Sequence, residues 1–420
     1  MLKKSSLFVA LMLAVIMCLA SIPAVFAATT PPEGTPDAPA QAGITKILKV
    51  PVGTDLPAGM SFNFEVEKVS YNGDTSATGA MPDLGTAGNV NIPVSGDGTT
   101  VNGITTYVLE SGNLAGINWP NTGIYKYKIT EIDESANYNQ DPDVKEETHF
   151  SGAEYTLTVY VREGKTQAGD TVLYVHYAEG VVVIVDDDDV AHTGDKVDPT
   201  PGGNKEDYFY SQIIFTNRYV KTNLIVDPTT EEGPLAVSKA VEGVYANHNQ
   251  FFQFKLTMAA PSISDFSGPF KAYILEGTTV VDLDDVDNPN TKTDTDAKGD
   301  YIEFTNDPNG TTFYLKDGQR LAFLDTPVGT SFTAIETEVT GYVTNILLHG
   351  ENRTSRSTGL QYVADKAGSL AAYTNTNNGT PPTGLNLNDL PFIAMIILAA
   401  GAFIALAVAK SRKRKASDNI

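Results

Sequence analysis

The chain has 420 residues, a formal net charge of -22 and a single cysteine. Such an excess of acidic side chains excludes nucleic acid and anionic lipid as favoured partners, because both would be repelled. The length is enough for two or three domains of ordinary size.

Residues 1–27 have the three parts of a secretory signal peptide. Two lysines begin the segment, an apolar run covers residues 7–20, and residues 25–27 have small side chains, Val25 and Ala27, at the positions that a signal peptidase reads. The apolar run is short for a transmembrane helix. Cys18 lies inside this segment, so the exported chain is expected to contain no cysteine and must be stabilised without disulfides.

The composition changes after the signal peptide. Residues 28–42 are rich in Pro, Ala, Gly and Thr and are predicted to be a disordered leader. Beyond them, apolar and polar residues alternate in short runs separated by turn residues, as at residues 62–67. This pattern, with no long amphipathic helix, predicts an all-β chain of two tandem immunoglobulin-like β-sandwich domains. The predicted boundaries are 43–220 for the first sandwich, 221–234 for a linker and 235–379 for the second sandwich.

The two halves repeat one arrangement of polar residues. Each half has a lysine in its first predicted strand, a glutamate in a late strand and an asparagine in its last strand. Side chains two residues apart share one face of a strand, and the residue two positions before each of these six is apolar or aromatic. All six polar side chains are therefore predicted to face a core. They are Lys46, Glu131 and Asn217 in the first half and Lys239, Glu336 and Asn375 in the second.

These residue types can react with one another inside a core. Burial lowers the pKa of a lysine and raises that of a carboxylic acid, because it disfavours both charged forms. A neutral amine can attack a carboxamide carbon while a protonated glutamate polarises the carbonyl and carries the proton. Orientation in a dry core can supply roughly 7–11 kcal/mol of such a barrier. Conventional buried salt bridges are the alternative.

The same segments resemble the isopeptide-linked domains of Gram-positive pilins, such as the major pilins of streptococci. The resemblance covers most of residues 43–384 and implies crosslinks Lys46–Asn217 and Lys239–Asn375, with Glu131 and Glu336 catalytic. One departure is Ile335, which stands before Glu336 where the family usually has threonine. The matching segments are 44–46, 127–131 and 215–217 in the first half, and 237–239, 315–318, 327–329 and 373–375 in the second.

The C-terminal residues form a second tripartite signal. Residues 390–409 are apolar and long enough to span a bilayer, and residues 410–420 are basic, which favours the cytoplasmic side. Before them stands a pentapeptide that resembles the Leu-Pro-x-Thr-Gly signal of sortases, with threonine in place of leucine. The resemblance implies that a sortase cleaves after Thr383 and joins it to an amine; a plain membrane anchor is the alternative. The pentapeptide is Thr380, Pro381, Pro382, Thr383 and Gly384.

Polymerised pilins also need an acceptor lysine, which in the family usually lies near the end of the first domain. The position that corresponds best holds Tyr210, so the match fails there. Lys196 and Lys205 lie nearby in a stretch rich in Pro and Gly, and Lys205 is the candidate polymerisation lysine.

The sequence as a whole predicts a structural pilin subunit of the pilus shaft, secreted and anchored to the cell wall of a Gram-positive bacterium. Its expected partners are a sortase, identical subunits or peptidoglycan, and a host surface ligand, with no nucleic acid. The alternative is a monomeric cell-wall-anchored adhesin. Apart from self-crosslinking, no enzyme activity, cofactor or metal is expected: the histidines are scattered, residues 186–189 are interpreted as a solvated loop, and residues 294–300 as a turn.

Overall fold

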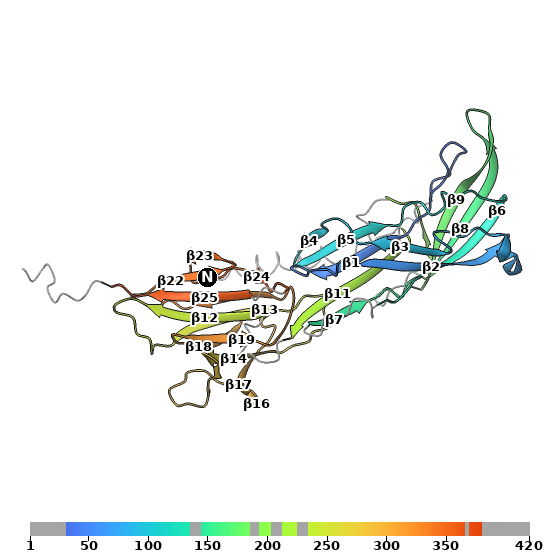
Figure 1. The fold of residues 1–420 in the computed structure, drawn as a ribbon. Helices are drawn as coiled ribbons and strands as arrows, with labels where there is room; N and C mark the ends of the chain where they lie inside the picture. The colour runs from blue at the N-terminus through green and yellow to red at the C-terminus, as the bar shows by residue number, and fades with distance from the viewer. Residues whose placement is uncertain are drawn as a thin grey trace, which may run out of the picture.

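The regular secondary structure of the described residues is almost entirely β-strand. In the computed structural model, the only helix among the described residues is the short 3-10 helix η1 (Thr75–Ala80). Figure 1 shows two sandwiches end to end, the first blue to green and the second yellow to red. The predicted all-β class is confirmed. The structure describes residues 31–134, 144–184, 193–202, 212–224, 234–365 and 369–379.

The first sandwich consists of two facing sheets, each with six strands within the described ranges, and one of these strands, β20, comes from the second half of the chain. One sheet has the order β20-β11-β1-β5-β4, with β7 also paired to β11. Its strands are β1 (Thr45–Pro51), β4 (Thr99–Val101), β5 (Ile104–Glu110), β7 (Val144–His149), β11 (Ile214–Leu224) and β20 (Asp325–Pro327). The facing sheet contains, in spatial order, β10 (Lys196–Val197), β9 (Thr171–Ile184), β8 (Glu154–Lys165), β6 (Gly123–Glu131), β2 (Ser61–Tyr71) and β3 (Asn89–Pro93).

The second sandwich pairs a large sheet with a small one. The small sheet consists, in order, of β18 (Thr311–Leu315), β13 (Phe252–Ala259), β21 (Ser331–Glu336) and β24 (Gln361–Tyr362). In the large sheet, β15 (Thr279–Val280) pairs with β14 beside the main order. That order is β16 (Asp294–Asp296), β17 (Gly299–Phe304), β14 (Phe270–Glu276), β19 (Gln319–Phe323), β12 (Leu235–Glu242), β25 (Ser369–Thr376), β22 (Val343–Leu348) and β23 (Glu351–Thr354).

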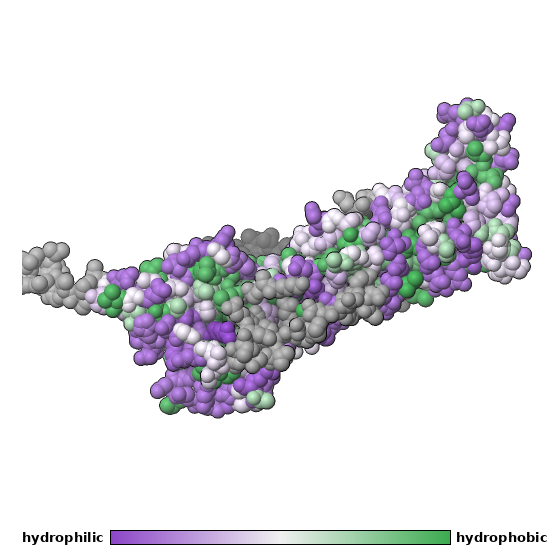
Figure 2. All heavy atoms as spheres, viewed as in Figure 1, coloured by the Kyte–Doolittle hydropathy of each residue, from purple (hydrophilic) through white to green (hydrophobic). Residues whose placement is uncertain are grey.

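Each core lies between the two sheets of its sandwich. In β2, Phe62, Phe64 and Val66 are buried while the residues between them are not, as the alternation predicts. The aromatic rings of Phe64 and Phe215, from facing sheets, have centroids 5.0 Å apart. Burying one such side chain contributes about 1.5–3 kcal/mol. Hydrophilic residues cover most of the visible outer surface (Figure 2).

The first and last strands of each half lie side by side. β1 pairs with β11 in parallel, and β12 pairs with β25 in parallel. The register is equivalent in both pairs: Lys46 lies opposite Phe215, and Lys239 lies opposite Tyr373. This closure brings each lysine next to the strand that carries the asparagine.

β11 continues beyond the first sandwich and reaches the second. One edge pairs first with β1 and then, at residues 222–224, with β20, while the other edge pairs with β7. Residues 221–224 of the predicted linker are therefore strand, and 225–233 lie outside the described residues. Contact here is close: a Cβ on Gly329, which has φ +78°, would lie 2.4 Å from Cβ of Pro51, so only glycine fits.

The N-terminal segment differs from the predicted disorder over residues 34–42. The Gly34 N–H donates to the His176 carbonyl at 2.8 Å and the Ala40 N–H to the Val175 carbonyl at 2.9 Å. Ala42 is fully buried, because its small side chain fits against the core. The predicted signal peptide, sorting motif, apolar span and basic tail lie outside the described residues, among which no helix is long and apolar enough to cross a membrane.

Candidate functional site

The structure brings Lys46, Glu131 and Asn217 together in the first core. The lysine and the asparagine come from the adjacent strands β1 and β11, and the glutamate comes from β6 in the facing sheet. All three side chains are shielded from solvent. Lys46 Nζ lies 2.7 Å from Glu131 Oε1 and 2.8 Å from its Oε2. Asn217 Nδ2 donates to the same Oε1 at 2.9 Å.

The carbonyl of Asn217 has its own donor. The backbone N–H of Ser151, which follows β7, donates to Asn217 Oδ1 at 2.8 Å and to Glu131 Oε2 at 3.2 Å. This hydrogen bond orients the carboxamide so that its nitrogen, Nδ2, faces the glutamate. A donor at a carbonyl oxygen also stabilises the negative charge that forms there when the carbon is attacked.

Aromatic rings surround the first lysine. Lys46 Nζ lies 4.7 Å from the ring centroid of Phe62 and 5.9 Å from that of Phe64. Burial in this apolar environment raises the pKa of Glu131 above its usual range, while the lysine beside it opposes the rise. The environment therefore favours the protonated acid that the predicted reaction requires.

The second core holds Lys239, Glu336 and Asn375 in the same arrangement. Lys239 Nζ lies 2.8 Å from Glu336 Oε1, and Asn375 Nδ2 donates to that same oxygen at 2.6 Å. The lysine lies 4.2 Å from the ring centroid of Phe252 and 5.9 Å from that of Phe254. Burial lowers the pKa of Lys239 to about 8, although Glu336 partly opposes the shift. About a tenth of this amine is thus uncharged at pH 7.

One glutamate oxygen touches both nitrogens in each core. Oε1 of Glu131, or of Glu336, contacts the lysine nitrogen, which must lose protons, and the carboxamide nitrogen, which must gain one to leave as ammonia. A carboxyl group in this position can carry a proton from nucleophile to leaving group without moving. The geometry therefore fits amide exchange between a lysine and an asparagine.

The sequence prediction missed two features near these cores. Ser151 acts through its backbone N–H, which has no sequence pattern. Lys221 is also buried, although it lies in the predicted linker. Its parity along β11 is that of Asn217, and this parity was the signal that could have revealed it.

Other predicted site residues are not placed together. Thr380, Pro381, Pro382, Thr383, Gly384 and Lys205 lie outside the described residues. Lys196, the other lysine near the end of the first half, is exposed and donates to Glu179 at 2.8 Å.

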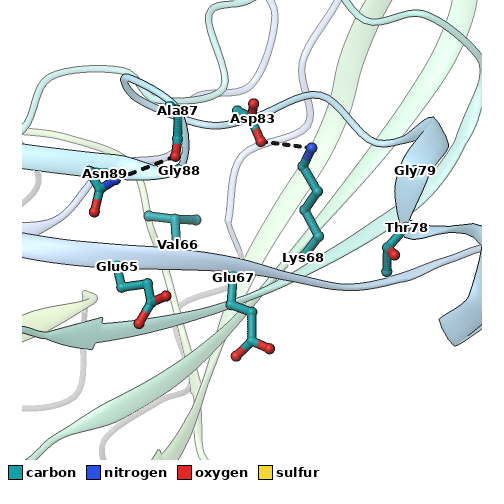
Figure 3. Close-up of a pocket in the computed structure, with 10 residues that line it drawn as sticks. All are labelled: Glu65, Val66, Glu67, Lys68, Thr78, Gly79, Asp83, Ala87, Gly88 and Asn89. Atoms are coloured by element: carbon teal, nitrogen blue, oxygen red, sulfur yellow. Dashed lines mark hydrogen bonds and ion pairs between the residues drawn. The ribbon is translucent and has the colours of Figure 1, made fainter.

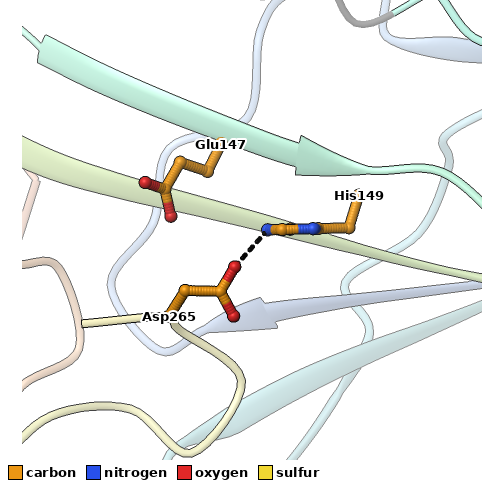
Figure 4. Close-up of side chains that lie close together, drawn as sticks. All are labelled: Glu147, His149 and Asp265. Carbon is orange, nitrogen blue, oxygen red and sulfur yellow. Dashed lines mark ion pairs between the residues drawn. The ribbon is translucent and has the colours of Figure 1, made fainter. Parts of the chain in front are cut away.

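Three further polar features carry no reactive arrangement. A surface hollow of about 420 Å³ beside β2 contains a partly exposed ion pair of Lys68 and Asp83, 2.7 Å apart (Figure 3). The acidic residues 294–300 lie in the β16–β17 hairpin, and Asp300 is paired with Lys292 at 3.2 Å. His149 Nε2 lies 3.1 Å from Asp265, with Glu147 beside them, where the two sandwiches meet (Figure 4).

Comparisons with known proteins give one family match and several structural similarities. The family described as a domain of unknown function (DUF7601) matches residues 233–377. No curated protein matches the chain. The structure is similar to the major pilin from Streptococcus pyogenes, with 19% identity, coverage of 81% of this chain and 99% of that chain, and a TM-score of 0.31.

Two other solved structures show weaker similarity. The T-13 major pilin from Streptococcus pyogenes has 17% identity over 80% of this chain and 97% of that chain, with a TM-score of 0.27. A pilus-presented adhesin, Cpa, has 13% identity, and the similarity covers 54% of this chain and 37% of that chain, with a TM-score of 0.24.

Proposed function

We propose that the chain is a structural pilin subunit in which an autocatalytic Lys–Asn isopeptide bond locks each sandwich. A sortase joins the subunits and anchors them to the cell wall of a Gram-positive bacterium. The observation that carries the proposal is the position of Glu131 and Glu336, each with one oxygen in contact with both reacting nitrogens. Two independent cores repeat this arrangement, with equivalent strand register.

An ordinary buried ion pair explains this arrangement less well. Removing a lysine and a glutamate from water costs several kcal/mol, and a core gains little from such a pair compared with apolar side chains. An ion pair also gives no reason for an asparagine to share the same glutamate oxygen. Conversion of lysine and asparagine into an amide removes the charged amine and leaves a neutral group in the core.

The bonds would suit a fibre under tension. Each joins the first strand of a sandwich to the last and encloses about 170 or about 137 residues, which by the loop-entropy relation is worth on the order of 5 kcal/mol. A pull on the ends of a sandwich would pass through the crosslink between neighbouring strands. The hydrogen-bonded sheets would carry little of the load.

The test of the crosslinks is the intact mass of residues 28–383, expressed without the signal peptide and tail. The wild-type protein should show the loss of two ammonias, about 17 Da each, since each lysine displaces one. The double variant Glu131→Ala/Glu336→Ala is the control and should show neither loss of ammonia. A wild-type protein at full sequence mass would refute the proposed bonds.

Assembly needs a separate experiment in the native bacterium. An immunoblot of cell-wall extract should show a ladder of high-mass species that resists SDS, and Lys205→Ala should abolish the ladder. Replacement of Thr383 and Gly384 by alanine should leave the protein in the membrane fraction. Monomer alone in a strain that expresses its sortases would favour an anchored adhesin instead.

A further inference from the structure

A third buried lysine lies where the two sandwiches meet. Lys221 Nζ, on β11, is 2.9 Å from Asp365 Oδ2 and 3.8 Å from Glu146 Oε1. The side chains of Lys221, Asp365 and Glu146 are only 7%, 1% and 6% exposed. Lys221 and Glu146 belong to strands of the first sandwich, whereas Asp365 precedes the last strand of the second. The proposed reactions within the two cores use none of these residues.

Main-chain contacts hold the three side chains in place. Glu146 lies directly opposite Lys221 in the β7–β11 register, and β20 pairs with the residues that follow Lys221. Asp365 donates its N–H to the Gly53 carbonyl at 3.1 Å, and its Oδ2 accepts the Asp55 N–H at 3.1 Å. Both potential reactants are therefore fixed in contact, which is the condition for high effective concentration.

This cluster resembles the two core sites, with an aspartate in place of the asparagine. A lysine on the closing strand stands near an aromatic ring, with Nζ 5.9 Å from the centroid of Tyr219, and two groups with carbonyl carbon atoms lie within reach. Glu146 Oε2 and Asp365 Oδ1 are buried and accept no hydrogen bond from the part of the chain that the structure describes. Buried carboxylate oxygens without donors are costly, so a plain ion pair leaves this cluster poorly satisfied.

We propose that Lys221 Nζ and Asp365 Cγ become joined by an amide bond between the two sandwiches. One proton passes from the ammonium to the carboxylate, which gives a neutral amine and a neutral acid. The nitrogen lone pair attacks Cγ, and Glu146 takes a proton from the nitrogen and delivers it to the hydroxyl oxygen that leaves. One C–N bond forms, one C–O bond breaks, and one water is released with no oxidation or reduction.

Such a bond would fix the two sandwiches to each other. It would connect β11 directly to the segment before β25. Tension would then bypass residues 225–234 and the strands that lie in sequence between Lys221 and Asp365. The inference does not depend on polymerisation or on the two Lys–Asn bonds. Those bonds release ammonia, about 17 Da each, whereas this one releases water, about 18 Da, so their failures are distinguishable.

The experiment is peptide mapping of the full-length protein by tandem mass spectrometry after digestion with trypsin and a glutamate-specific protease. The bond would block cleavage after Lys221, so residues 219–231 should be recovered attached to residues 357–366. The linked species should weigh about 18 Da less than the sum of the two peptides, because one water is lost. Lys221→Arg should abolish it, since a guanidinium keeps the charge but does not react as the amine does.

Glu146→Gln tests the proton carrier, and Glu147→Gln, the next residue along β7, is the matched control. The first change should reduce the linked species at least tenfold while both losses of ammonia remain, and the second should leave all three bonds unchanged. Recovery of residues 357–366 only as a free peptide from the wild-type protein would overturn the proposal. Full linkage in Glu146→Gln would overturn the role assigned to Glu146.

Discussion

The two sandwich cores hold the same three side chains but treat the asparagine carbonyl differently. In the first core, Asn217 Oδ1 accepts the Ser151 N–H at 2.8 Å. In the second, Asn375 Oδ1 is buried and has no hydrogen-bond partner among the described residues. The shared glutamate thus places the nucleophile and the leaving group in both cores, while only the first also has a donor at the electrophile.

Strand length explains this difference. β7 ends at His149, which lies opposite Arg218, so Asn217 is beyond the end of β7 and the following turn presents the Ser151 N–H to it. In the second sandwich β22 pairs with β25 past the asparagine, with Thr344 opposite Asn375. Within the described residues, no turn reaches the carbonyl from that edge. We therefore expect the first bond to form faster than the second, because a donor at a developing oxyanion lowers the barrier.

Removal of one glutamate should have the largest effect and should separate the two cores. Glu131→Ala should prevent one of the two losses of ammonia, about 17 Da, and leave the other, because each glutamate serves one lysine. The first sandwich should then lose stabilisation on the order of 5 kcal/mol, seen as a lower melting temperature and faster cleavage by trypsin. Glu336→Ala should do the same to the second sandwich only, since the cores share no side chain.

The isosteric variants Glu131→Gln and Glu336→Gln serve as controls for side-chain volume. A glutamine fills the same space but does not carry a proton, so both crosslinks should fail as they do in the alanine variants. Loss of both bonds from a single substitution would show that the two cores are coupled and would contradict their independence.

Removal of the Ser151 N–H should slow the first bond only. Ser151→Pro deletes this donor, and the loss of one donor at an oxyanion costs on the order of 10² in rate. The rate is measured by mass after a chain that has never folded is diluted from denaturant into native buffer. Ser151→Ala keeps the N–H and should leave both rates unchanged. Equal rates in the proline variant and the wild type would show that the donor plays no part.

The sequence alone was enough to place the six core residues because strand parity is local. Lys46 and Lys239 share a face with apolar neighbours, and the structure buries both. The role of Ser151 could not be predicted, since it depends on a backbone group in a turn and on where β7 ends. The prediction misses Lys221 because this residue falls in the predicted linker, and its partner Asp365 approaches only through packing of the second sandwich against the first.

The pH dependence of the second bond gives the smallest effect and tests whether its lysine is desolvated. Burial lowers the pKa of Lys239 to about 8. Below that pH the neutral, reactive fraction falls about tenfold per pH unit, so the rate of Lys239–Asn375 bond formation should rise about tenfold from pH 6 to pH 7 and level above about pH 8. The first bond, followed in the same sample by its own crosslinked peptide, is the internal reference.

For a lysine at its ordinary pKa of 10.5 the rise in rate would continue beyond pH 10. A rate that climbs without levelling up to pH 10 would therefore show that the amine stays solvated until it reacts, and that the buried arrangement of Lys239 and Glu336 follows the reaction instead of causing it.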